Sequence, residues 1–284
     1  MPDRSAPLPP STLERALARD RWLIGAALAV LVALAWAYLL SLAQQMAGAA
    51  GASSLATMPD MPGMPGMPGM PAMPAQPPWT LSTFALTTLM WWAMMIGMMV
   101  PSAAPMVLLF GVVQRRQPAG ENPALRVAAF TLGYLATWAA FSVLAAGAQW
   151  ALIELAVLAP MELTATPWLA AVIVALAGVY QLTPLKNVCL RHCRSPAEFL
   201  SAHWRRGNLG ALRMGVEHGA YCVGCCWLLM ALLFAVGVMN LLWVAVLAVF
   251  VLIEKVVPRG ELVARASGAA MLAFAAYLAL SAAS

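Results

Sequence analysis

The sequence predicts an all-α protein, a polytopic membrane helix bundle of about seven transmembrane helices with a cytoplasmic N-terminus. Its composition is the first observation: 63% of the 284 residues are hydrophobic, 10% are charged, and the mean hydropathy is +0.81. A soluble domain typically carries about 25% charged residues, so a soluble globule is excluded. The other two observations are long apolar runs and a one-sided distribution of basic residues.

The apolar runs have the length of membrane helices, since a bilayer-spanning helix needs roughly 20 mostly apolar residues. The expected helices are residues 22–42, 81–113, 126–148, 168–182, 219–239, 240–257 and 262–283. The second run is overlong and contains Pro101 and Pro105, which predict a kink or an interfacial extension. Continuous apolar runs lack the alternation that barrel strands require. The predicted organisation is a cytoplasmic tail (1–21), a first transmembrane helix (22–42), a Met/Pro-rich outer linker (43–80) and a six-helix membrane core (81–283) with a cytoplasmic Cys/His loop (184–213).

Basic residues predict the orientation. All sixteen Lys and Arg fall in residues 4–21, 115–126, 186–213 and 255–265. A bundle of seven helices with a cytoplasmic N-terminus would place all four of these segments on the cytoplasmic side of the membrane. This agrees with the positive-inside rule and predicts a multi-pass protein of the bacterial inner (plasma) membrane, with the lipid bilayer as its solvent. The first apolar run is longer than the core of a usual signal peptide, so we expect a retained anchor. The net charge of +5 then reflects topology, and nucleic-acid binding has no support.

A methionine repeat occupies the predicted outer linker. Methionine and proline recur every three residues, with the methionines at Met58, Met61, Met64, Met67, Met70 and Met73. Proline at this spacing forbids helical hydrogen bonding and predicts an extended linker. Thioether sulfur is a soft, uncharged ligand that suits Cu(I). The repeat is either an outer metal-collecting segment or a low-complexity spacer.

A second group of methionines lies in one predicted helix, at Met90, Met94, Met95, Met98 and Met99. At 100° per residue, Met90, Met94 and Met98 fall with the two prolines within about 80° of arc. Sulfur atoms at this spacing would offer successive weak sites for a soft metal. The alternative is that methionine fills irregular gaps in helix packing.

Cysteine and histidine form two clusters at the predicted cytoplasmic side. The first contains Cys189, His192 and Cys193, and the second contains His218, Cys222, Cys225 and Cys226. Spacings of three and four place such residues on one helix face. Thiolates with an imidazole could hold Cu(I), or Zn(II) if a further ligand joins them. The alternative treats these cysteines as small packing residues.

Other chemistry finds little support. The predicted outer loops contain no cysteine pair for thiol exchange, and Cys-x-x-Cys-His, the haem attachment motif, is absent. No nucleophile–base–orienter set occurs, so we expect no enzyme, no catalytic residues and no organic cofactor. Glu254 and Lys255 could be functional, although a snorkelling pair at a helix end is the simpler interpretation. His203 is interpreted as a surface anchor.

Several motifs together resemble the bacterial family of predicted metal-binding integral membrane proteins, long labelled a domain of unknown function. They are the Met90–Met106 stretch with its Pro-Ser-Ala-Ala-Pro core, Tyr180–Lys186, Cys189–Cys193, His218–Trp227, Gly237–Asn240 and Glu254-Lys255. That family includes membrane copper chaperones that serve copper-dependent polyphenol oxidases. The resemblance implies copper delivery to an oxidase client, with Met94, Met95, Met98, Met99, Cys222, Cys225 and Cys226 at the family's motif positions. The outer repeat lies outside it.

These observations predict an integral membrane copper-binding protein or copper chaperone that acquires Cu(I) and passes it to a copper enzyme or across the membrane. The rival hypothesis is a non-catalytic membrane scaffold or small-solute permease in which methionine and cysteine only pack.

Overall fold

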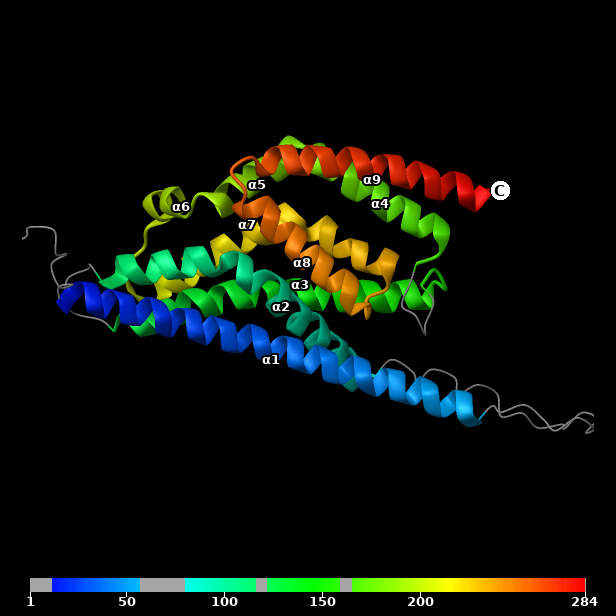
Figure 1. Cartoon of the computed structure of the whole chain (residues 1–284), viewed down its shortest axis with the longest axis horizontal. Coiled ribbons are helices and arrows are strands. Elements are labelled where there is room, and N and C mark those ends of the chain that lie inside the picture. The colour runs from blue at the N-terminus through cyan, green and yellow to red at the C-terminus, as the bar shows by residue number, and fades with distance from the viewer. Residues whose placement is uncertain (1–11, 57–79, 116–121, 159–164, 284) are drawn as a thin grey trace, which may run out of the picture.

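The computed structural model describes residues 12–56, 80–115, 122–158 and 165–283, and regular structure within them is helical (Figure 1). Within these residues, β-type pairing is limited to an isolated antiparallel bridge between Leu158 and Ala165. The helices are α1 (Thr12–Ala56), α2 (Leu81–Arg115), α3 (Pro123–Glu154), α4 (Pro167–Leu182), α5 (Pro184–Arg194), α6 (Pro196–His203), α7 (Gly207–Val236), α8 (Leu241–Val256) and α9 (Gly260–Ala283). The all-helical prediction is confirmed.

The seven predicted apolar runs coincide with α1, α2, α3, α4, α7, α8 and α9, but several ends differ. Helix α1 continues to Ala56, so residues 43–56 are helical and do not belong to an extended linker. Alanine has the highest helix propensity, and this stretch is rich in alanine and contains no proline, which explains the extension. The predicted repeat from Met58 to Met73 lies outside the described residues.

Five described helical segments are long and apolar enough to cross a membrane, within α1, α2, α3, α7 and α9. Helices α4 and α5 would form a sixth span together, bent by 68° where they meet. Helix α8 has 16 residues, a length of about 24 Å, and falls short of the roughly 30 Å of hydrocarbon in a bilayer. Five to six candidate spans are compatible with a membrane protein.

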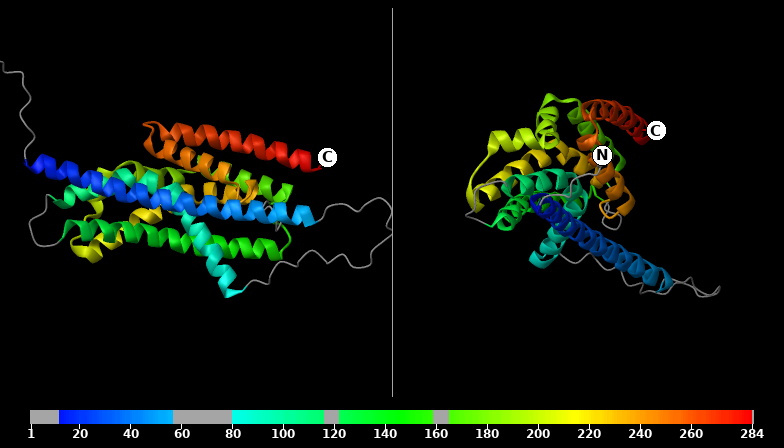
Figure 2. Two further views of the ribbon diagram at one scale, coloured as in Figure 1. Left: turned by 60° about the horizontal axis from the view of Figure 1, so that its bottom comes forward. Right: turned by 60° about the vertical axis from the view of Figure 1, so that its left-hand side comes forward.

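Helix α2 is the central element of the bundle. It packs against α1, α3 and α8, and its residues 93–100 are all buried. Figure 2 shows that α2 changes direction partway along its length. Pro101 and Pro105 lie inside the helix, and proline removes a backbone N–H donor and collides with the preceding turn. The expected kink is therefore present.

Glycines bring α3 and α7 unusually close together. A Cβ added at Gly215 of α7 would lie 2.0 Å from the carbonyl oxygen of Phe130, and one at Gly133 of α3 would lie 2.2 Å from that of Leu212. Small residues at such crossings let helix backbones approach closely in membrane proteins. This contact fixes α7, and with it the cysteines, relative to the rest of the bundle.

The helix ends that carry basic residues lie toward one end of the bundle. In Figure 1 the start of α1, the end of α2, helices α5 and α6, and the start of α7 all lie toward the left. The predicted loop 184–213 contains α5, α6 and the first turns of α7. Helix α5 is amphipathic, because Lys186, Leu190 and Cys193 are buried along one face.

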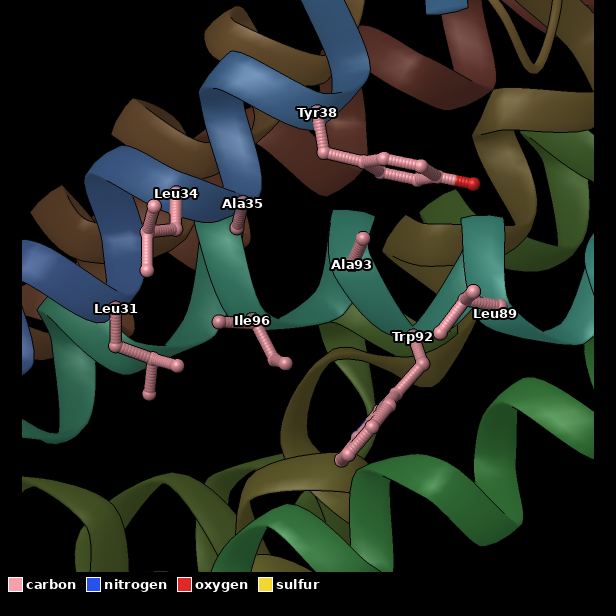
Figure 3. Close-up of a pocket in the computed structure, with 8 residues that line it drawn as sticks. All are labelled: Leu31, Leu34, Ala35, Tyr38, Leu89, Trp92, Ala93 and Ile96. Carbon is pink, nitrogen blue, oxygen red and sulfur yellow. The ribbon is translucent and has the colours of Figure 1, made fainter.

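A cavity of about 220 Å³ lies between α1 and α2. Figure 3 shows Leu31, Leu34, Ala35 and Tyr38 of α1 lining it together with Leu89, Trp92, Ala93 and Ile96 of α2. None of these side chains offers sulfur or imidazole nitrogen, so this cavity has no ligands for a soft metal.

Candidate metal site

Four cysteines from two helices come together in the interior of the bundle. Cys222, Cys225 and Cys226 of α7 are each at most 2% exposed, and Cys193 of α5 lies against them. The sulfur atoms of Cys193 and Cys225 are 3.9 Å apart. We call Cys193, Cys222, Cys225 and Cys226 the thiol cluster. The three cysteines of α7 lie together because their spacings of three and four residues put their side chains on one face of the helix.

The thiol cluster also contacts the methionines of α2. Met90, Met94, Met95, Met98 and Met99 are all buried, and the sulfur of Met99 lies 3.9 Å from the sulfur of Cys226. Burial alone does not distinguish a ligand from a packing residue, because α2 is buried on most of its circumference here. The contact between Met99 and Cys226 favours a ligand role, because it brings a thioether directly against a thiol.

Lys255 of α8 is the charged member of the site. Its ammonium nitrogen is 2.9 Å from the sulfur of Cys222 and 3.0 Å from the hydroxyl of Ser102, and the residue is 7% exposed. A buried ammonium is stable only beside a compensating partner. Cys222 occupies that position, which fits a thiolate. Tyr134 completes the surroundings, with its hydroxyl 3.2 Å from the same sulfur and 3.1 Å from the Met99 carbonyl.

The expectation that Glu254 and Lys255 form a snorkelling pair is wrong. Glu254 is 1% exposed and accepts hydrogen bonds of 2.8 Å from Lys186 and from Gln181. The end of α8 packs against α2, α5 and α7 instead of reaching water. Successive helix residues point about 100° apart, so the two side chains meet different neighbours and not each other.

His218 lies one turn before Cys222 and is 2% exposed. Its ring contacts are aromatic, with centroids 5.8 Å from Tyr134, 6.1 Å from Phe130 and 5.3 Å from Phe199. The Nδ1 atom of His218 has no hydrogen-bond partner. The ring is thus held beside the thiol cluster by packing, with one nitrogen left unsatisfied.

The predicted group of Cys189, His192 and Cys193 divides into separate surroundings. Cys193 joins the thiol cluster, whereas Cys189 is half-buried and lies close to Gly224, where an added Cβ would be 2.9 Å from its sulfur. His192 stacks on Tyr221, with ring centroids 4.1 Å apart. The six methionines of the outer repeat lie outside the described residues.

The thiol cluster is not a preformed cage. Within the part of the chain that the structure describes, no three Cys, His, Asp or Glu side chains are arranged to hold a metal ion. The thiols of Cys225 and Cys226 are hydrogen-bonded at 3.1 and 3.0 Å to the carbonyl of Cys222. A cysteine sulfur can move to another staggered position by rotation about a single side-chain torsion. These residues therefore fit a soft metal whose binding would bring the sulfur atoms into position.

Lys255, Tyr134 and Ser102 are the members of the site that were not among the predicted ligands, although Lys255 and Ser102 lie in motifs that carry the family resemblance. A lysine beside an apolar run was a usable signal, because ionisable residues within membrane segments are rare and usually functional. Tyr134 carried no such signal.

Comparisons with known proteins point to the same chemistry. A family model described as a copper chaperone, PpoB2, matches residues 88–278. This span includes the α2 methionines and all five cysteines but leaves out α1 and the outer repeat. No curated protein and no solved structure is significantly similar to the chain.

Proposed function

Because this chain belongs to the PpoB2 copper chaperone family, we propose that it acquires Cu(I) in a membrane and passes it to a copper enzyme or across the bilayer. The observation that carries the proposal is the contact between Cys226 and Met99, which joins a thiol cluster to a row of thioethers. Thiolate and thioether are the soft ligands that favour Cu(I) over hard cations. Copper is the cargo here, and the chain supplies ligands without any chemical conversion.

In this proposal the tighter cargo site is the thiol cluster, with Cys222 and Cys225 as the first two ligands. Two thiolates and one Cu(I) carry a net charge of −1, and Lys255 beside Cys222 brings the site to neutrality. Zn(II) in the same ligands would leave a net positive charge in a low-dielectric interior, which is costly. The charge balance therefore favours a monovalent metal, and zinc finds no support.

The methionines of α2 form the weaker part of the path. Met90, Met94, Met95, Met98 and Met99 follow the helix axis and end at the thiol cluster. Neutral thioethers bind Cu(I) more weakly than thiolates, so an ion can exchange along them without being trapped. The kink in α2 fits this role, because prolines leave carbonyl groups without their helical partners where a cavity or neighbour can satisfy them.

The outer repeat, Met58 to Met73, would collect copper at the start of this path. Its six thioethers tolerate an oxidising compartment, in which exposed cysteines would form disulfides. This role rests on ligand chemistry alone.

We further propose seven membrane crossings in the inner membrane of a bacterium, with the N-terminus in the cytoplasm. The short helices α4 and α8 would cross with the help of bends and neighbouring helices. The gathering of basic helix ends toward one end of the bundle (Figure 1) supports this orientation, because the positive-inside rule places such ends in the cytoplasm.

Copper retention tests the function. Full-length protein purified in detergent, reduced and loaded with excess Cu(I), is expected to keep about one copper per chain after desalting against a weak Cu(I) chelator. A scaffold or permease with packing cysteines would keep none, and that result would refute the proposal. The measurement is metal content by mass spectrometry, with a membrane protein that has buried but non-ligating cysteines as the control.

A further inference from the structure

The three histidines of the chain gather around two neighbouring aromatic rings, those of Phe199 in α6 and Tyr221 in α7. His203 stacks on Phe199 with centroids 4.7 Å apart, and His218 meets the same ring at 5.3 Å. His192 stacks on Tyr221 at 4.1 Å and lies 6.1 Å from His203. The sequence places these histidines on three helices, so their gathering is a property of the fold.

The hydrogen bonds of His192 and His203 define their tautomers. The Nδ1 atom of His192 is 2.9 Å from the carbonyl oxygen of Val188, and that of His203 is 3.2 Å from the carbonyl oxygen of Phe199. A carbonyl oxygen only accepts, so in both rings Nδ1 carries the proton and donates it. In a neutral imidazole the other nitrogen, Nε2, then keeps its lone pair. This is the arrangement in which a backbone carbonyl orients a metal-binding histidine.

Both rings line one cavity of about 220 Å³ that is separate from the apolar cavity of α1 and α2. Glu198 and Arg191 also line it, and Arg191 is paired with Glu261 at 3.4 Å. The two histidines are partly exposed, so the cavity is accessible from the surface.

Short connections link this cavity to the thiol cluster. Cys193 follows His192 in α5, and its sulfur contacts that of Cys225. Tyr221, on which His192 stacks, precedes Cys222 in α7. The cavity and the buried cluster therefore lie on different sides of the same turn of α5, with His192 facing the one and Cys193 facing the other.

We infer that His192 and His203 form a second metal site, an imidazole pair that holds Cu(I) at the mouth of the thiol cluster and exchanges it with Cys193. This inference rests on the proposed function and adds a place where copper is loaded or released. The exchange involves no electron transfer. The Nε2 lone pairs bind Cu(I), the incoming cysteine sulfur replaces an imidazole nitrogen as its thiol proton leaves to water, and copper remains Cu(I). Neutral imidazoles bind Cu(I) less tightly than thiolates, as a transfer site requires.

The test compares full-length variants in detergent, each titrated with Cu(I) and examined by X-ray absorption at the copper edge. The H192Q/H203Q variant removes both imidazoles, and S201A, on the exposed face of α6, is the matched control. The C222S/C225S variant removes the buried ligands but keeps the imidazole pair. Loading rates are measured by transfer from a coloured Cu(I)–chelator complex under anaerobic conditions.

We expect C222S/C225S to bind copper weakly with nitrogen ligands, and the same variant to lose this nitrogen signal when H192Q/H203Q is added to it. The H192Q/H203Q variant should reach the wild-type content of sulfur-bound copper about 10-fold more slowly, which also shows that it is folded. Loading by H192Q/H203Q at the rate of S201A, or nitrogen ligation that persists without these histidines, would overturn the inference. A nitrogen-ligated site that takes Zn(II) but not Cu(I) would also overturn it. Failure of the proposed function is distinct, because it would remove the sulfur-bound copper from the wild type.

Discussion

The C222S/C225S variant is expected to lose the tightly held Cu(I), with an affinity about 100-fold or more below that of the wild type. Even outer-shell changes cost roughly 10- to 100-fold in metal affinity, and these residues are proposed as direct ligands. Serine hydroxyl is a harder ligand than thiolate and stays neutral near pH 7, so it replaces neither the softness nor the charge of cysteine. Competition with a chelator of known Cu(I) affinity measures the loss.

Cys189→Ser is the matched control for this prediction. Cys189 belongs to the same helix as Cys193, α5, but is half-buried and lies outside the thiol cluster. C189S should bind Cu(I) within about threefold of the wild type, a change below 1 kcal/mol. If C222S/C225S and C189S bind Cu(I) equally well, the thiol cluster is not the cargo site and its cysteines only pack.

Replacing Lys255 with leucine is expected to weaken Cu(I) binding by about 10- to 100-fold while strengthening Zn(II) binding relative to copper. Hydrogen bonds to charged groups contribute roughly 1.5–3 kcal/mol, and 1.4 kcal/mol corresponds to one factor of ten. Without the ammonium, two thiolates with Cu(I) keep an uncompensated charge of −1, whereas with Zn(II) they become neutral. Leucine keeps much of the volume of lysine and adds no sulfur, so the fold should survive and no new Cu(I) ligand is introduced.

Ser102→Ala is the control for Lys255. It removes the second contact of the ammonium, at 3.0 Å, without changing any charge. We expect S102A to weaken Cu(I) binding by about 1 kcal/mol or less and to leave the preference for Cu(I) over Zn(II) intact. A purely structural role for Lys255 would lower thermal stability in K255L without altering that preference, and this outcome would refute the charge-balance argument.

The helices of this protein could be predicted because their apolar runs are long, and a bilayer demands that length. The structure differs where local propensity extends a helix beyond the apolar run, as in the alanine-rich end of α1. The bend between α4 and α5 also escaped the sequence argument, although Pro184 marks the point where α5 begins.

The candidate site was predictable only where one helix carries it. Cys222, Cys225 and Cys226 share a face of α7 because of their spacing. Cys193 joins them because α5 packs closely against α7, where Gly224 leaves room for Cys189. Lys255 reaches Cys222 only through the packing of α8, a tertiary relation that no local pattern contains. The same holds for His203, which the sequence suggests as a surface anchor but the fold places beside His192.

X-ray absorption at the copper edge of wild-type protein loaded with one equivalent of Cu(I) tests the central claim most directly. We expect a first coordination shell made of sulfur alone, from the cysteines of the thiol cluster with or without Met99. A shell made of nitrogen or oxygen, or copper that is lost on desalting, would contradict it.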